Sequence, residues 1–163
     1  DNEEFTILAR YSSNPKFSKI HKQKFGLDQG VISHAWQHGE HSETQCPRYD
    51  GDHGEAYNAY IKEAYGYTDS ELSEMTMKSC RYFGLSITDA DDNIGIILFE
   101  SESEDELSQE ITTEIKNYCE QYQSHLCQFV KDGMIYDRTL KSNIQAKNHS
   151  TDQEVLQALG DKK

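Results

Sequence analysis

The segment SCRYFGLSITDADDNIGIILFES, residues 79–101, decides the fold because it reads as two β-strands joined by a tight turn. Within it, FGLSI at 83–87 alternates apolar with small or polar residues, which is the period of a strand with one apolar face. TDADDN at 88–93 combines the Asp and Asn residues that favour turns. IGIILF at 94–99 is apolar at nearly every position, as in a buried strand. We therefore predict a long antiparallel hairpin.

The segments before this hairpin are predicted from apolar periodicity and turn residues. Strands are expected at 5–10, 17–25 and 41–47, and helices at 30–38, 55–67 and 68–75. Asp28 is expected to cap the first of these helices, and Thr68 or Asp69 the third. This order of elements indicates an α+β fold, in which a central antiparallel sheet is flanked by helices.

The longest helix is expected directly after the hairpin. Ser103 and Glu106 match a capping box, and Gly133 is expected to end the helix. Between them, apolar residues recur at helical steps of three and four. They are Leu107, Ile111, Ile115, Tyr118, Tyr122, Leu126 and Phe129. We therefore predict a domain over residues 1–133 and a polar tail over residues 134–163 that is either flexible or loosely docked.

The charge of the chain restricts its partners. Its formal net charge is −13, so phosphate backbones and anionic membrane surfaces repel it. We therefore expect no nucleic acid and no membrane contact for this segment. No apolar run approaches the roughly 20 residues of a membrane span, and the 4 cysteines lack the pattern of a disulfide framework. These features favour free thiols and a cytoplasmic location.

Two segments carry a resemblance to a known family. GVISHAWQHG at 30–39 fits a pattern of Gly, two apolar residues, Ala and Gly at fixed spacing. The hairpin at 79–101 fits a serine-led strand, a polar turn and a glycine-led apolar strand. The residues that carry the match are Gly30, Val31, Ile32, Ala35, Gly39, Ser79, Gly95, Ile96, Ile97 and Ser101. Over about residues 4–131 the chain resembles a GAF domain.

The resemblance implies a GAF-like fold with a long C-terminal helix. It also implies a non-catalytic sensory or regulatory domain that binds a small molecule, forms a homodimer, or does both. The family's usual first helix is missing and Asp1 begins the chain, so we expect a piece of a longer signalling protein, with an output or membrane segment elsewhere. The alternative is a GAF-derived module for protein–protein contact that holds no ligand.

Tyrosines are concentrated in the segment that covers the ligand pocket of GAF domains. Their rings would line a small-molecule site, with a guanidinium group meeting an anion and a tryptophan at the edge. The candidate ligand-binding residues are Trp36, Arg48, Tyr57, Tyr60, Tyr65 and Arg81. The alternative interpretation is that these tyrosines pack against the sheet as part of the core.

Three histidines raise the hypothesis of a metal site. His34 and His38 share a helix face at the spacing of zinc-binding histidines in metalloproteases. Ala35 stands where the protease signature has Glu, and Gly39 is expected to end the helix before His41. We therefore expect no metal, and name these three histidines as the ligands if that expectation is wrong.

Thiol chemistry is the other enzymatic hypothesis. Some GAF domains reduce methionine sulfoxide with a nucleophilic and a resolving thiol. Cys46 has no cysteine near it in the sequence, and only the fold can bring Cys80 beside it. We therefore expect a protein that is not an enzyme and carries no cofactor.

Overall fold

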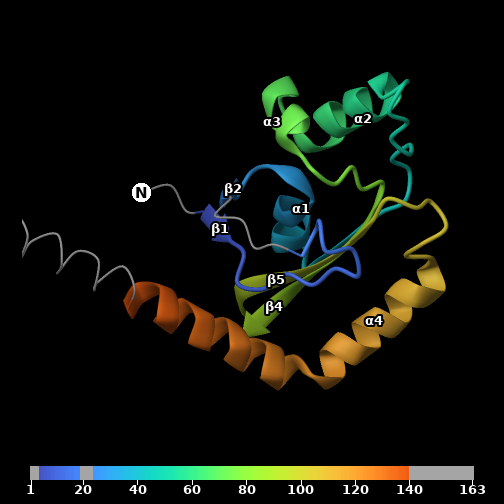
Figure 1. Ribbon diagram of the computed structural model, residues 1–163. Coiled ribbons are helices and arrows are strands. Elements are labelled where there is room, and N and C mark those ends of the chain that lie inside the picture. The colour runs from blue at the N-terminus through green and yellow to red at the C-terminus, as the bar shows by residue number, and fades with distance from the viewer. Residues whose placement is uncertain (1–3, 19–23, 140–163) are drawn as a thin grey trace, which may run out of the picture. The chain divides into compact units, whose positions relative to one another are not determined.

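The computed structural model describes residues 4–18 and 24–139, and this part of the chain is an α+β fold. The chain divides into two compact units, Asp1–Cys127 and Gln128–Lys163. The first unit contains β1 (Glu4–Thr6), β2 (Lys24–Gly26), α1 (Gly30–His38), β3 (Glu40–Glu43), α2 (Glu55–Tyr65), α3 (Asp69–Glu74), β4 (Arg81–Asp89), β5 (Asp92–Ser101) and α4 (Gln109–Gln121) (Figure 1). Residues 123–139 are helical as well. Residues 140–163, which include most of the predicted tail, lie outside the described residues.

The hairpin predicted at residues 79–101 is confirmed. β4 and β5 are antiparallel, with Arg81 paired to Ser101 at the open end and Asp89 to Asp92 at the turn. The two turn residues, Ala90 and Asp91, have φ values of 48° and 73°, which is the left-handed geometry of a two-residue hairpin turn. β3 pairs with the other edge of β4, so β4 is the central strand of a three-stranded sheet.

The remaining two strands form a separate sheet, which corrects the prediction of one central sheet. β1 pairs only with β2, over Glu4–Thr6 and Lys24–Gly26. β1 ends at Thr6 and is shorter than predicted, and the chain turns at residues 13–17, where the N–H of Phe17 donates to the carbonyl of Asn14. Residues 19–23 of the predicted second strand lie outside the described residues.

Helices cover the two faces of the three-stranded sheet. Phe83 and Leu85 of β4 pack with Cys119 of α4 in one buried cluster. Gly84, between them, faces Ala35 of α1. Because neighbouring residues of a strand point to opposite faces, α1 and α4 lie on opposite faces of the sheet. A second cluster lies around α2. Its buried members are Val31, Cys46, Tyr57, Ile61, Tyr65, Leu72 and Cys80.

Two helix termini differ from the prediction. The residue before α1 is Gln29 rather than Asp28, and its side chain makes no capping bond. α4 begins after Ser108, whose hydroxyl accepts the N–H of Ile111, so the predicted Ser103 cap is wrong. Leu107, just before it, has a φ of 52°, which no helix residue can adopt. The predicted cap at Thr68 is confirmed: it forms a capping box with Glu71.

The predicted end and apolar face of the last helix are also corrected. Helical geometry is interrupted at Tyr122, resumes at residue 123 and passes the predicted end at Gly133. Ile111 and Tyr118 remain 43% and 63% exposed, whereas Cys119 is buried against the sheet. Ile115 and Leu126 of the stripe do pack against the buried cluster of Phe83, Leu85 and Cys119, so the predicted stripe faces the sheet only in part.

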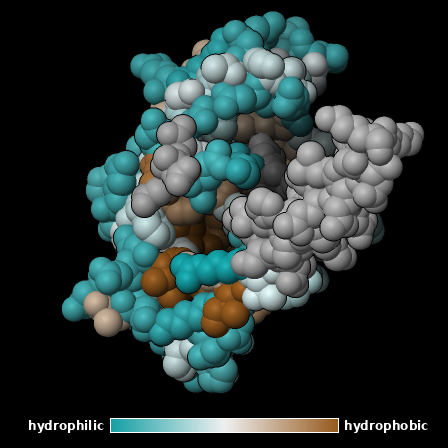
Figure 2. Space-filling view, turned by 90° about the vertical axis from the view of Figure 1, so that its left-hand side faces the viewer, coloured by the Kyte–Doolittle hydropathy of each residue, from teal (hydrophilic) through white to brown (hydrophobic). Residues whose placement is uncertain are grey.

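The surface agrees with the composition. The mean hydropathy of the chain is −0.86, and most of the residues that Figure 2 colours by hydropathy are hydrophilic, with a smaller group of apolar ones among them. No helix in the described part of the chain combines the length and the apolar character that crossing a membrane requires.

Candidate functional site

The end of β3 places a buried carboxylate beneath α2. Glu43 is 6% exposed and accepts four hydrogen bonds. Its Oε2 accepts from the hydroxyls of Tyr60 at 3.0 Å and Tyr65 at 2.5 Å, and its Oε1 from the N–H groups of Gln45 at 2.6 Å and Cys46 at 2.9 Å. Burial alone would raise the pKa of Glu43, but these donors outweigh it and hold that pKa below its ordinary value. Glu43 is therefore a fixed anion in neutral solution.

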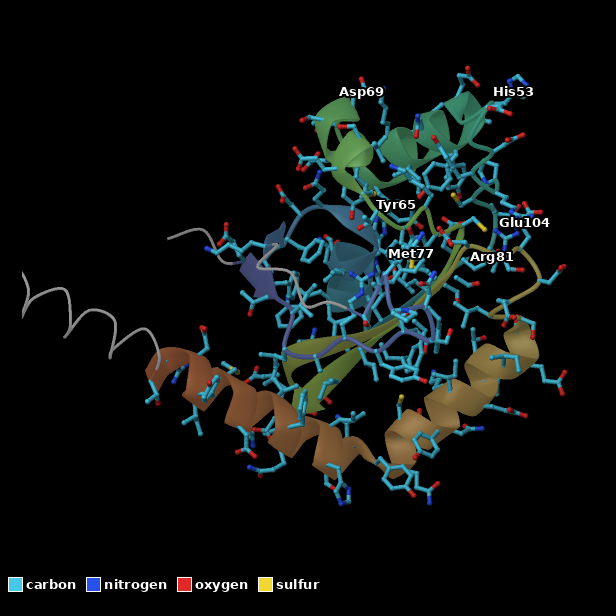
Figure 3. All side chains as sticks on the ribbon, in the orientation of Figure 1. His53, Tyr65, Asp69, Met77, Arg81 and Glu104 are labelled. Atoms are coloured by element: carbon cyan, nitrogen blue, oxygen red, sulfur yellow. The ribbon has the colours of Figure 1, made fainter. Side chains whose placement is uncertain are left out.

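The sequence of α2 explains how two tyrosines reach one carboxylate. Tyr57, Ile61 and Tyr65 are the buried residues of α2, at helical steps of four. Gly66 has a φ of 71° and ends the helix directly after Tyr65, with its N–H bonded to the carbonyl of Lys62. Tyr65 thus stands in the last turn of α2, as Figure 3 shows, where its hydroxyl meets Glu43.

A histidine extends this network toward α1. The Nε2 of His41 lies 3.0 Å from the hydroxyl oxygen of Tyr65. Because Tyr65 gives its proton to Glu43, its oxygen accepts a hydrogen bond from Nε2–H of His41. The ring of His34 lies 4.8 Å from that of His41, centroid to centroid. Burial and then the neighbouring His34 lower the pKa of His41, although Glu43 acts in the opposite direction.

This network predicts a loss of stability at mildly acidic pH. The pKa of His41 is lower in the folded chain than its ordinary 6.5, so the unfolded chain binds the proton first. The contribution of His41 to the free energy of unfolding is therefore complete above pH 6.5 and is lost as the pH falls through the folded pKa. Thermal unfolding of His41→Gln, which keeps a donor for Tyr65, should show a weaker loss between neutral and mildly acidic pH.

The matched control for this titration is His53→Gln, in an exposed loop. The thermal stability of this variant should depend on pH in the same way as that of the unmodified chain, since His53 forms no part of the network. Equal pH dependence in His41→Gln and the unmodified chain would contradict the prediction. The titration of Glu43 lies below its ordinary 4.5 and so falls in a separate pH window.

The three histidines of the metal hypothesis lie near one another. His34 is between the others, and Nδ1 of His38 is 3.0 Å from the carbonyl oxygen of His34. Among the residues that the structure describes, no group of three or more His, Cys, Asp or Glu side chains is arranged to hold a metal ion. The structure instead shows these histidines in ring contacts with one another and in hydrogen bonds to protein groups.

The predicted ligand-binding residues have different surroundings in the structure. Tyr60 and Tyr65 meet at Glu43, whereas the hydroxyl of Tyr57 donates to the carbonyl of Ser79 at 3.0 Å inside the core. Trp36 packs edge-on against a phenylalanine of β1, with ring centroids 5.1 Å apart. The tyrosines of α2 therefore act as packing residues whose hydroxyl groups already have partners.

The two arginines of that prediction differ in exposure. The side chain of Arg48 is exposed. Arg81 lies near Glu104 at the start of β4 (Figure 3), and its Nε donates to the carbonyl of Glu104 at 3.2 Å. Its Nη1 donates to the carbonyls of Cys46 and Cys80, each at 2.8 Å. Arg81 thus binds backbone oxygens, and its guanidinium ties the β3–α2 connection to β4.

The same region bears on the thiol hypothesis. Cys46 and Cys80 are both completely buried. Burial, with the nearby charge of Glu43, raises the pKa of Cys46 to about 12, and burial also raises the pKa of Cys80. Both groups are therefore protonated in neutral solution, whereas the thiolate is the nucleophile. These surroundings disfavour thiol-based catalysis.

A groove that the sequence interpretation missed lies on the opposite face of the sheet, against α4. Its volume is about 600 Å³. It is lined by His38, Gly39, Glu40, Leu85, Ser86, Ile87, Thr88, Ile97, Lys116, Cys119, Glu120, Gln123 and Leu126. None of the six predicted ligand-binding residues belongs to this lining. A sequence signal existed, since Lys116, Cys119 and Gln123 recur at helical steps beside the apolar stripe.

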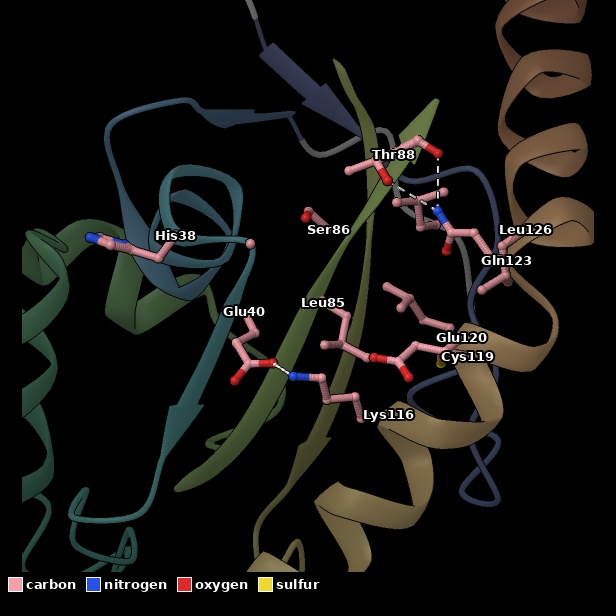
Figure 4. Close-up of a pocket in the computed structure, with 13 residues that line it drawn as sticks. His38, Glu40, Leu85, Ser86, Thr88, Lys116, Cys119, Glu120, Gln123 and Leu126 are labelled. Atoms are coloured by element: carbon pink, nitrogen blue, oxygen red, sulfur yellow. Dashed lines mark hydrogen bonds and ion pairs between the residues drawn. The ribbon is translucent and has the colours of Figure 1, made fainter. Parts of the chain in front are cut away.

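Two polar contacts cross this groove (Figure 4): one joins α4 to the sheet, and the other joins the sheet to Gln123, just past the break at Tyr122. The Nζ of Lys116 lies 2.5 Å from Oε2 of Glu40, next to α1. The Nε2 of Gln123 donates to the carbonyl and the hydroxyl of Thr88, at 3.0 and 3.3 Å. Between the two contacts, the groove has the apolar side chain of Leu85 on the sheet side. The position of α4 is thus tied to two contacts that line the groove itself.

Comparisons with models of protein families, with curated proteins and with solved structures found no match to this chain. The resemblance to GAF domains stays a prediction.

Proposed function

We propose that the chain is a non-catalytic sensory or regulatory module, GAF-like in kind, that binds a small molecule in the groove between β4 and α4. The observation that carries this proposal is the groove, whose volume of about 600 Å³ falls within the usual range for ligand pockets, roughly 300–1,000 Å³. Its mix of apolar and polar lining residues is also typical of such pockets.

The polar contacts across the groove supply a mechanism for sensing. A ligand that hydrogen-bonds to the donors of these contacts, Lys116 and Gln123, or to their acceptors, Glu40 and Thr88, competes with the contacts. Binding would then favour a second position of α4. The size of the shift depends on how much more tightly the ligand binds the chain with α4 in that position than in the unliganded one. A helix that moves with occupancy is a means of passing a signal along the chain.

Two features support a non-catalytic role. The buried carboxylate of Glu43 is fully engaged by four donors and so is not free to accept a proton from a substrate. The buried thiols of Cys46 and Cys80 are protonated. The groups with the most perturbed surroundings are thus built into the core, where they stabilise the fold.

The alternative is a module for protein–protein contact, including a homodimer, with no ligand. It is favoured by Tyr118 on α4 and Tyr122 directly after it, which are 63% and 38% exposed and have ring centroids 4.6 Å apart. Exposed aromatic side chains of this kind are typical of contact surfaces. The two functions use different faces of α4, so they can be tested separately.

The proposal is tested by NMR of the uniformly labelled chain with a library of small molecules. Binding compounds should shift amide signals of β4 and α4, including Lys116 and Gln123. Cys119→Trp, which fills the groove, should abolish these shifts, whereas Tyr118→Trp, which adds the same ring on the exposed face, should not. Shifts confined to the Glu43 region, or unchanged binding by folded Cys119→Trp, would contradict the proposal. If no compound binds and the molecular mass of the protein in solution rises with its concentration, the alternative of a protein–protein contact module is supported.

A further inference from the structure

The charges around the groove are unevenly balanced. Two carboxylates, Glu40 and Glu120, face one ammonium group, Lys116. Lys116 is hydrogen-bonded to Glu40, and this contact and the charge of Glu40, with a smaller contribution from Glu120, raise the pKa of Lys116. Within the described part of the chain, the carboxylate of Glu120 has no hydrogen bond or ion pair. The groove therefore has one negative charge that is not neutralised.

The wall between the polar contacts is apolar. Leu85 packs in one cluster with Cys119, Ile97 and Leu126. Burial raises the pKa of Cys119, so its thiol stays protonated and packs as a small apolar group. From Lys116 to Gln121, where α4 ends, the helix rises by about 7.5 Å, at roughly 1.5 Å per residue. An apolar body of about one ring and a short chain fits this length.

From this placement we infer that the ligand of the groove is a small organic cation with an apolar body, such as a protonated amine carried on an aromatic or hydrocarbon group. The inference rests on the proposed function, because it assigns a ligand class to the same groove. The apolar body covers Leu85 and Leu126, and the ammonium group meets Glu120 at the rim. An anion of the same shape finds the ammonium group of Lys116 already paired with Glu40, and is repelled by the net charge of −13.

Three probes with one apolar body separate charge from shape: 4-phenylbutylamine, 4-phenylbutanol and 4-phenylbutyrate. Each is titrated into the full chain, with the amide signals of β4 and α4 as the readout. The amine should bind about two- to fivefold more tightly than the alcohol, which is the size of an exposed ion pair, and the carboxylate should bind most weakly. Added salt should reduce the difference between the amine and the alcohol.

Variants of α4 assign the effect to a residue. Glu120→Gln should remove the advantage of the amine, whereas Glu110→Gln, in the first turn of the same helix and outside the groove lining, should keep it. Lys116→Met removes the ammonium and frees Glu40, so amine binding should become tighter by about the same factor. This gain is a result that mere loss of structure cannot produce.

The outcomes distinguish the ligand class from the proposed function. Tighter binding of the carboxylate, or equal binding of all three probes at the groove, would overturn the ligand class and leave groove binding intact. If no probe shifts the groove amides, the ligand class is overturned as well, and the proposed function is then decided by the library experiment. An unchanged preference for the amine in Glu120→Gln would also overturn the inference.

Discussion

Replacement of Glu43 by Leu is expected to lower the free energy of unfolding by about 3–5 kcal/mol, because it leaves several buried donors without an acceptor. Those donors are the hydroxyl of Tyr65, which is 5% exposed, and the N–H groups of Gln45 and Cys46. Leu has nearly the volume of Glu, so the loss reports hydrogen bonding rather than a cavity. Urea denaturation followed by circular dichroism measures it.

Two milder variants isolate the role of the carboxylate. Tyr60→Phe removes one half-buried donor and leaves three bonds to Glu43, so it should cost about 1 kcal/mol. Glu43→Gln keeps one acceptor oxygen for the backbone N–H groups, so its loss in free energy of unfolding should lie between those of Glu43→Leu and Tyr60→Phe. A loss for Glu43→Leu no greater than that for Tyr60→Phe would show that Glu43 does not organise this region.

The features that could be predicted from the sequence are those set by local chemistry. The hairpin follows from alternation along β4 and from turn residues at 88–93, and both act within a few residues of each other. The cap at Thr68 is equally local, since its partner Glu71 lies three residues away. The end of α1 at Gly39, with a φ of 83°, follows from the freedom of glycine to adopt positive φ.

The burial of Glu43 could not be predicted, because its donors come from distant parts of the chain. In the sequence, Glu43 lies in a polar segment, HSETQ at 41–45, that looks exposed. Its burial depends on Tyr60 and Tyr65, which α2 brings back over the end of β3. The same packing gives the tyrosine hydroxyls their hydrogen-bond acceptor. These surroundings are the ones expected if the tyrosines are core residues, which was the alternative interpretation.

The groove was missed for a related reason. The apolar stripe of the last helix suggested which face would be buried, but periodicity gives no weight to polar residues. The contacts of Lys116 with Glu40 and of Gln123 with Thr88 span 76 and 35 residues of sequence. These contacts help to place α4, and the stripe residues Ile111 and Tyr118 stay exposed as a result.

Replacement of Gly84 by Val is expected to lower the free energy of unfolding by about 2–3 kcal/mol. A Cβ atom at Gly84 would lie 2.8 Å from Cβ of Ala35 and 3.5 Å from Cδ1 of Leu98. Ala35 is completely buried in α1, and its short side chain cannot move aside. The valine must therefore push α1 away from the sheet. Gly51→Val, in an exposed loop with nothing within 4 Å of its Cβ position, is the matched control and should change stability by less than about 0.5 kcal/mol.

A double-mutant cycle decides whether the contact with Ala35 is the cause. Ala35→Gly alone should destabilise the chain by about 1 kcal/mol, from its lower helix propensity. In the Gly84→Val background the same change makes room for the valine, so its cost should vanish or reverse sign. Additive losses would mean that the strain lies elsewhere in β4. His34 directly precedes Ala35 and lowers the pKa of His41, so displacement of α1 should weaken this effect of His34. NMR titration of His41 in Gly84→Val should then show a pKa closer to the ordinary value.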